Sequence, residues 1–259
     1  MSKTAIQDER RGTSSDKTLA MMDLFTPDRP EWTVEEACVA LGQSESTTYR
    51  YFRSLASVGL IFSVRSGRYL LGPGIVHYDR QLRMSDPLLS AAQPIMVELA
   101  QAIERPARIF ISRIFRNHVM AVHEHLIQGG LVADQTFARG QLGPVFQGAP
   151  ALAMLAFQEV RVVRSLFNKI DGGDGDWLDT KRQMRATRSL GYAVGVDAPD
   201  DGVLHVSVPV KQGDTGIAGS LSFAFNSAGH DPRSVATWGS LLIDAAATLA
   251  ARAGAQARS

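Results

Sequence analysis

The side chains best suited to bind another molecule lie on one face of a helix predicted near residue 50. An inner stripe three to four positions apart, formed by Thr48, Phe52 and Leu55, predicts this helix over about residues 44–58. Its outer face carries Ser46, Tyr49, Arg50 and Arg53. Hydroxyl and guanidinium groups on a helix can read base edges in the major groove of DNA, and cations can hold phosphates. This face therefore predicts DNA binding, with a solvated face used for protein contacts as the alternative.

Local charge favours the DNA hypothesis although the total charge does not. Over 259 residues, 27 basic and 26 acidic side chains give a net charge of +1. Between Arg50 and Arg83, however, the sequence has six arginines and one acidic residue, Asp79. Such a basic stretch attracts nucleic-acid phosphates. The predicted contacts are Ser46, Thr47, Tyr49 and Arg50 in the groove, and Arg53, Arg65 and Arg68 at the backbone or an adjacent groove.

Cap and turn signals around this helix predict a winged helix-turn-helix. Thr33 and Glu36 have the spacing of a capping box, so a second helix should begin there and end at Gly42. A three-residue turn, Gln43-Ser44-Glu45, then leads into the arginine-rich helix, with Ser44 as its predicted N-cap. Two β-prone runs follow, residues 60–64 and 68–71, and the glycine between them predicts a hairpin.

The rest of the chain predicts a linker and a second domain of mixed α and β structure. Ser85-Asp86-Pro87 is a strong helix-start signal. The strands expected after it are residues 108–113, 118–123, 192–196, 203–210 and 217–225. Central strands with helices before and after them are typical of an α/β sensor domain rather than a helical bundle. The predicted division is a flexible tail, residues 1–17; a winged helix, 18–72; a linker helix, 73–85; and a sensor domain, 86–255.

A series of short motifs is distributed along the chain. The N-terminal motifs are Ser46-Thr47-x-x-Arg50-x-x-Arg53-x-Leu55, Gly59-Leu60 and Gly67-Arg68-Tyr69-x-Leu71-Gly72. The C-terminal motifs are Gly140-x-x-x-Pro144, Arg188-x-x-Gly191-Tyr192-Ala193, Gly202-Val203 and Val208-Pro209-Val210. In order and spacing, from residue 19 to the C-terminus, they resemble the IclR family of bacterial transcriptional regulators.

The resemblance implies both a fold and a mode of action. The implied fold is α+β, with an N-terminal winged helix-turn-helix joined by a linker helix to a GAF-like α/β effector-binding domain. The implied protein is a homodimer or a dimer of dimers that binds a double-stranded DNA operator, and a small-molecule effector alters this binding. Whether it represses or activates does not follow from the sequence.

By family position, the resemblance also implies an effector site between the sensor sheet and residues 143–149. The implied residues are Phe146, Met154, Asp197, His205 and Ser222. A few polar groups among apolar walls suit a small organic or aromatic acid. Phe146, and the absence of a second hydroxyl after Ser222, favour an aromatic or phenolic ligand over a two- or three-carbon acid. For Phe146, Met154 and Ser222, packing in the core is an equal alternative.

The chain departs from the family at positions that bear on specificity. Ser44-Glu45 and Tyr49 stand where the family commonly has Pro-Lys and His in the recognition helix, so no operator sequence can be carried over. In the sensor domain, Pro144-Val145-Phe146 and Ala151-Leu152 replace Pro-Leu-His and Gly-Lys. These replacements predict a less polar pocket mouth.

No motif indicates catalysis, a metal or a cofactor. A nucleophile elbow, a paired-carboxylate motif and a dinucleotide fingerprint are all missing from the sequence. The single cysteine, Cys38, excludes an internal disulfide and a structural zinc site, and we expect it to pack in the core as a small hydrophobic residue. We expect His118, His123 and His125 to be structural or exposed rather than metal ligands.

The sequence also bears on location and on a second hypothesis. No uninterrupted apolar run reaches the roughly 18 residues of a membrane span, and the polar N-terminus does not resemble a secretory signal. A cytoplasmic protein without a membrane partner is therefore expected. The alternative to a regulator is a metabolite-binding or enzymatic α/β domain whose winged helix serves protein–protein assembly.

Overall fold

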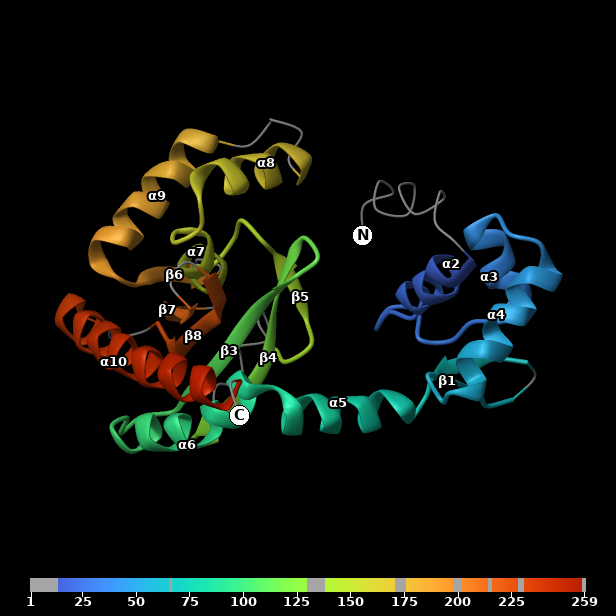
Figure 1. Ribbon diagram of the computed structural model, residues 1–259, viewed down its shortest axis with the longest axis horizontal. Coiled ribbons are helices and arrows are strands. Elements are labelled where there is room, and N and C mark those ends of the chain that lie inside the picture. The colour runs from blue at the N-terminus through green and yellow to red at the C-terminus, as the bar shows by residue number, and fades with distance from the viewer. Residues whose placement is uncertain are drawn as a thin grey trace. The chain divides into compact units, whose positions relative to one another are not determined.

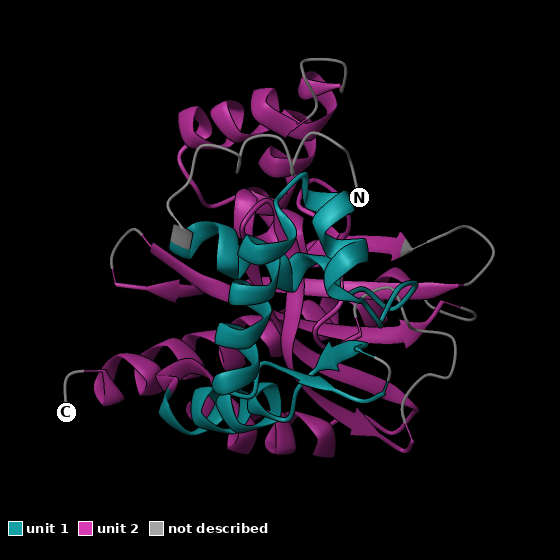
Figure 2. Cartoon of the chain, turned by 90° about the vertical axis from the view of Figure 1, so that its right-hand side faces the viewer, with its two compact units in different colours: residues 1–85 teal, residues 86–259 magenta. Residues whose placement is uncertain are grey.

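The chain forms two compact units, residues 1–85 and 86–259 (Figure 2). The computed structural model describes residues 14–65, 67–129, 138–170, 176–197, 202–213, 216–227 and 231–257. Most of the predicted N-terminal tail, residues 1–13, lies outside these ranges. Residues 14–17, predicted to belong to the tail, are helical. Asp16 in the first turn of this helix favours its start, because a carboxylate near a helix N-terminus is stabilised by the helix dipole.

The first unit contains the predicted helix-turn-helix followed by a hairpin. Its elements are α2 (Ser14–Ala20), the 3-10 helix η2 (Met21–Leu24), α3 (Val34–Leu41), α4 (Glu45–Ser57), β1 (Ile61–Ser63), β2 (Tyr69–Leu71) and α5 (Gly74–Ser85) (Figure 1). Strands β1 and β2 are antiparallel, with Phe62 opposite Leu70. The α5 helix has no buried residue among those described.

The predicted capping box of α3 is confirmed. The Thr33 backbone N–H donates to Glu36 Oε2 at 3.1 Å, and the Glu36 N–H donates to Thr33 Oγ1 at 3.2 Å. Gly42 ends the helix in the left-handed conformation, with φ of 61°, which glycine adopts without strain. Cys38, expected to pack in the core, is only half-buried, and its thiol lies 2.7 Å from the Gln43 carbonyl oxygen.

The inner face of α4 anchors this helix to the core of the first unit. Thr48, Phe52 and Leu55, the predicted stripe, are buried together with Tyr51. The Phe52 ring meets Tyr69 of the hairpin edge to face, with centroids 5.0 Å apart. Burial of three large side chains fixes the rotation of α4, so its outer face has one defined direction.

The second unit is built on a six-stranded sheet in the order β5-β4-β3-β8-β7-β6. Every neighbouring pair is antiparallel. Its elements are α6 (Pro87–Gln101), β3 (Ala107–Phe115), β4 (His118–Ile127), β5 (Leu142–Pro144), α7 (Ala149–Leu155), α8 (Val160–Ile170), α9 (Trp177–Leu190), β6 (Ala193–Asp197), β7 (Val203–Gln212), β8 (Gly216–Asn226) and α10 (Pro232–Gln256). The five predicted strands are present, β3 and β4 are longer than expected, and β5 was missed because only three residues form it.

Helices cover both faces of this sheet (Figure 1). The α6 and α10 helices lie side by side on one face, and α7 lies on the other, with α8 and α9 beyond it. By length and composition alone α10 is apolar enough to cross a membrane. Leu242, Ala246 and Leu249 are nevertheless buried in the main core, so α10 serves as a core helix of this unit.

Strand alternation gives the two faces of the sheet different chemistry. On the α6 and α10 face, β3 and β7 contribute only aliphatic residues to the main core: Ala107, Ile109, Ile111, Leu204, Val206, Val208 and Val210. The intervening positions of both strands point to the α7 face, because successive side chains of a strand alternate. Several of the side chains on the α7 face of the sheet are polar.

Candidate DNA-binding and effector sites

The outer face of α4 presents the predicted DNA-contacting residues to solvent. Ser46, Tyr49, Arg50 and Arg53 are all exposed, and Tyr49 is 56% accessible. The guanidinium carbon of Arg50 lies 5.6 Å from the centroid of the Tyr51 ring, within the range of a cation–π contact. An exposed helix face with two cations, a phenol and a hydroxyl can enter a groove and bind there.

The first turn of α4 holds a small group of hydroxyls. The Ser44 Oγ donates to Thr47 Oγ1 at 2.9 Å and lies 3.4 Å from Ser46 Oγ. Ser44 occupies the predicted N-cap position, but its side chain makes no capping bond to the backbone. Thr47 is half-buried, unlike the rest of the predicted face. The Ser44 side chain is therefore turned toward the outer hydroxyls instead of the helix amides.

The two arginines predicted for the wing have different surroundings. Arg65 is exposed at the turn of the hairpin. Arg68 is half-buried and lies between two acidic side chains, 3.9 Å from Glu31 and 3.7 Å from Glu36. Arg29 joins the same network, 3.2 Å from Glu36. Arg68 therefore braces the hairpin against the start of α3, which sequence spacing did not reveal.

Glu36 is the electrostatic centre of this network. The pKa of its carboxyl is lowered, first by the backbone N–H of Thr33 and then by Arg29 and Arg68. Both effects favour the ionised carboxylate. Glu36 thus couples the cap of α3 to two cations.

Three of the predicted effector residues meet on the α7 face of the sheet. His205 of β7 lies edge to face against Phe110 of β3, with ring centroids 5.8 Å apart. Ser222 of β8 stands directly opposite Phe110, and its Oγ lies 2.8 Å from Ser207 Oγ. Met154 of α7 packs in the same cluster as Phe110. All five side chains are buried.

Phe146, another predicted effector residue, lies outside this group. Phe146 packs against Phe167, with centroids 5.1 Å apart, in a separate cluster formed with α8 and α9. Asp197 ends β6, where its backbone pairs with Val203. The Asp197 side chain lies outside what the structure describes.

The same face buries polar residues that the sequence analysis did not single out. These are Arg108, Ser112, Ser207 and Ser220. Ser112 and Ser220 are directly opposite on β3 and β8, and neither hydroxyl has a hydrogen-bond partner among the described residues. An unsatisfied buried hydroxyl costs about 1–3 kcal/mol, so such groups usually mark a water or a ligand. The signal in the sequence was the alternation of aliphatic and polar residues along β3, starting at Arg108.

The three histidines of β4 differ in exposure, because His118 is exposed, His125 is half-buried and His123 is buried. His123 is buried, with its Nε2 2.9 Å from Gln93 Oε1 of α6. Across the described ranges, no group of three or more His, Cys, Asp or Glu side chains could hold a metal ion.

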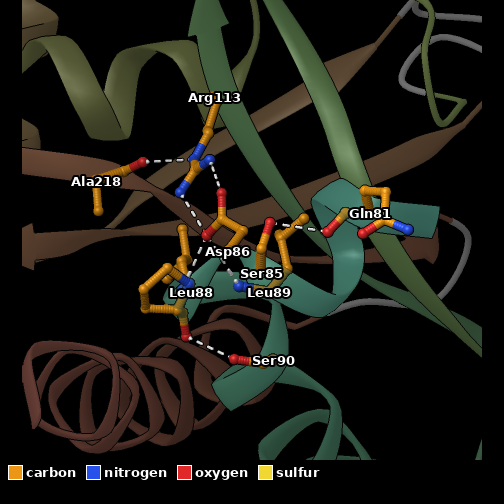
Figure 3. Close-up of polar contacts among 9 residues, drawn as sticks. Gln81, Ser85, Asp86, Leu88, Leu89, Ser90, Arg113 and Ala218 are labelled. Atoms are coloured by element: carbon orange, nitrogen blue, oxygen red, sulfur yellow. Dashed lines mark hydrogen bonds and ion pairs between the residues drawn. The ribbon is translucent and has the colours of Figure 1, made fainter. Parts of the chain in front are cut away.

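A bidentate ion pair lies where the second unit begins (Figure 3). Asp86 caps α6, because its Oδ1 accepts from the Leu88 N–H at 2.9 Å and from the Leu89 N–H at 3.3 Å. Both terminal nitrogens of Arg113 contact the same carboxylate, with Nη2 3.0 Å from Oδ1. The Arg113 Nε donates to the Ala218 carbonyl at 3.2 Å. The first turn of α6 is thereby tied to β3 and β8.

Comparisons with known proteins agree with this architecture. The model of the IclR helix-turn-helix domain matches residues 14–62. The HTH-type transcriptional regulator KipR of Bacillus subtilis is 22% identical over 214 residues, 80% of this chain and 84% of KipR. The structure of a putative IclR transcriptional regulator from a Silicibacter species aligns with a TM-score of 0.77 at 20% identity, over 93% of this chain and 96% of that chain. An IclR homologue from Microbacterium hydrocarbonoxydans, complexed with 4-hydroxybenzoate, aligns with a TM-score of 0.73 at 17% identity. The alignment covers 94% of this chain and 100% of that chain.

The order of the two units, a helix-turn-helix domain followed by an α/β domain, matches the architecture of IclR transcriptional regulators. Residues 14–62 therefore carry an IclR-type helix-turn-helix domain, and the chain as a whole has the fold of IclR transcriptional regulators. The predicted fold class is therefore confirmed. KipR is a transcriptional regulator, which favours the regulator hypothesis over the enzymatic alternative.

Proposed function

We propose that this regulator senses a small aromatic carboxylic acid in its second unit and changes its operator binding in response. The observation that carries the proposal is the polar set buried on the α7 face, where Ser112 and Ser220 are without partners among the described residues. Buried polar groups without partners are rare in folded proteins, and a bound water, ion or ligand commonly satisfies them. The homologue complexed with 4-hydroxybenzoate supports an aromatic acid as the class of effector.

The DNA-binding part of the proposal uses the outer face of α4. Ser46, Thr47, Tyr49 and Arg50 would contact base edges, while Arg53 and Arg65 would hold phosphates. Arg68 would act mainly by positioning the hairpin, because it is engaged by Glu31 and Glu36. We retain residues 18–72 as the DNA-binding domain, 73–85 as the linker and 86–255 as the sensor domain.

The ion pair between Asp86 and Arg113 would couple effector binding in the second unit to DNA binding by the first. Arg108, Phe110 and Ser112 of β3 face the proposed effector site, and Arg113 is the next residue of that strand. Arg113 holds Asp86, which follows directly after α5. A ligand that shifts β3 would therefore act on the end of the linker helix.

Assembly and location complete the proposal. A homodimer or a dimer of dimers would place two winged helices on a pseudo-palindromic operator. The exposed apolar residues of α5, among them Val76, Tyr78 and Met84, are compatible with an assembly contact. Operator binding requires a cytoplasmic location.

The test is selection of duplexes from a random DNA pool by the full-length protein, with and without a panel of aromatic and short organic acids. We expect a pseudo-palindromic site whose affinity changes with one member of the panel and falls steeply with salt. If no sequence is enriched under any condition, the proposal is wrong, and a winged helix used for protein assembly becomes the better hypothesis.

A further inference from the structure

Arg108 is the buried cation of the second unit's α7 face. It lies on β3 with only 4% of its surface exposed. Its neighbours two and four positions along the strand, Phe110 and Ser112, point the same way and are also buried. Because an arginine stays charged in proteins, it needs a negative partner when it is buried. A cation at this position selects for an anionic group in any ligand that enters the face.

The guanidinium lies over the residues of the proposed effector site. Its central carbon is 4.5 Å from the centroid of the Phe110 ring. Phe110 in turn contacts His205 and stands opposite Ser222. Two predicted effector residues therefore adjoin the same aromatic ring that Arg108 covers.

The negative partner of Arg108 comes from the neighbouring strand. Glu124 of β4 lies opposite Phe110, and its Oε2 is 3.3 Å from Arg108 Nη1. The Glu124 side chain is 32% exposed, so it can turn toward water at small desolvation cost. A planar guanidinium binds a carboxylate through two parallel hydrogen bonds, and a second carboxylate can replace the first in the same geometry.

We propose that Arg108 binds the carboxylate of the effector. In the absence of effector, Glu124 forms an ion pair with Arg108, and the effector carboxylate displaces it. The aromatic ring of the ligand would lie near Phe110 and His205. The hydroxyls of Ser112 and Ser220, which have no partner among the described residues, lie further along β3 and β8 and would receive a polar substituent at the other end of the ligand. This inference rests on the proposed function and names the residue that selects the ligand class.

If the effector carboxylate displaces Glu124 from Arg108, substitutions of these two residues should change the effector affinity in opposite directions. Arg108→Met removes the carboxylate-binding group, so the affinity for an acid should fall by about 10- to 100-fold. Glu124→Gln removes the competing carboxylate, so the affinity for the same acid should rise, by roughly threefold or more. An interaction that only supports the fold would weaken binding in both variants.

The experiment is calorimetry on the full-length protein with benzoate, 4-hydroxybenzoate, pyruvate and the amide of each. The preference for acid over amide should be lost in Arg108→Met and strengthened in Glu124→Gln. Arg182→Met and Glu159→Gln remove the same charges from exposed positions of the same unit and should change nothing. Circular dichroism establishes folding, and the double variant Arg108→Met with Glu124→Gln, which leaves no unpaired buried charge, should match Arg108→Met.

Each contrary result has a separate meaning. If the wild-type protein binds an acid and Arg108→Met or the folded double variant binds it equally well, Arg108 is not the anchor, and the proposed function survives. If the wild-type protein binds an amide as tightly as its acid, the inference is also wrong. If no compound binds the wild-type protein, both the inference and the proposed class of effector are wrong.

Discussion

At the scale of single residues, Arg50 separates DNA binding from assembly. It is exposed on α4, so Arg50→Ala should leave the free energy of unfolding within about 0.5 kcal/mol of wild type. Operator affinity should fall by about 1–3 kcal/mol if Arg50 contacts a base edge. Fluorescence anisotropy with the selected duplex measures this change, and Arg182→Ala, exposed in the second unit, is the matched control.

The same variant discriminates between the two uses of a winged helix. A loss of DNA affinity with unchanged oligomeric state in sedimentation supports a groove contact for Arg50. Altered assembly with unchanged DNA affinity would instead identify the outer face of α4 as a protein interface. A salt slope reduced by about one would assign Arg50 to a phosphate rather than a base.

At the scale of elements, the cap of α3 should make the first unit sensitive to acid. The pKa of Glu36 is lowered by the Thr33 N–H and by Arg29 and Arg68, so its carboxylate stabilises the fold above the ordinary carboxyl pKa. This stabilisation should be lost as the pH falls through the lowered pKa. Glu36→Gln retains an oxygen for the capping bond but loses both ion pairs.

Thermal unfolding of the wild-type protein and Glu36→Gln at neutral and acid pH tests the role of this carboxylate. We expect a lower Tm for the variant at pH 7, and a Tm difference that shrinks as the pH falls through the lowered pKa of Glu36 and the wild-type carboxylate becomes protonated. Equal differences at both pH values would show that the charge of Glu36 contributes nothing and that only the hydrogen bond matters.

At the scale of the whole molecule, effector and operator should alter each other's affinity by the same factor. The Asp86–Arg113 pair is expected to carry part of this coupling. Asp86→Asn retains a good N-cap for α6 but removes the ion pair, so the affinities of the two sites measured separately should stay near wild type. The ratio of effector affinities with and without operator should move toward one.

Titrations of the effector into free and operator-bound protein measure this ratio. An unchanged ratio in Asp86→Asn would remove the ion pair from the path. A wild-type ratio of one would contradict effector control of operator binding altogether, because a ligand shifts an equilibrium only through its different affinities for the two states.

The sequence by itself determined the features that depend on neighbouring residues. The Thr33–Glu36 cap, the end of α3 at Gly42 and the division of α4 into a buried and an exposed face all follow from local spacing. Local hydrogen bonds and helix periodicity set these features, so they can be read from a few consecutive residues.

The tertiary structure decided which distant residues meet. Strand register places Ser222 opposite Phe110 and brings His205 against the same ring, whereas Phe146, predicted beside them, packs with α8 and α9. Strand register also brings Glu124 close to Arg108, and this ion pair cannot be predicted from the sequence of either strand alone. The physical reason is that strand pairing joins segments far apart in the chain, and a shift of one residue would turn each of these side chains to the opposite face of the sheet.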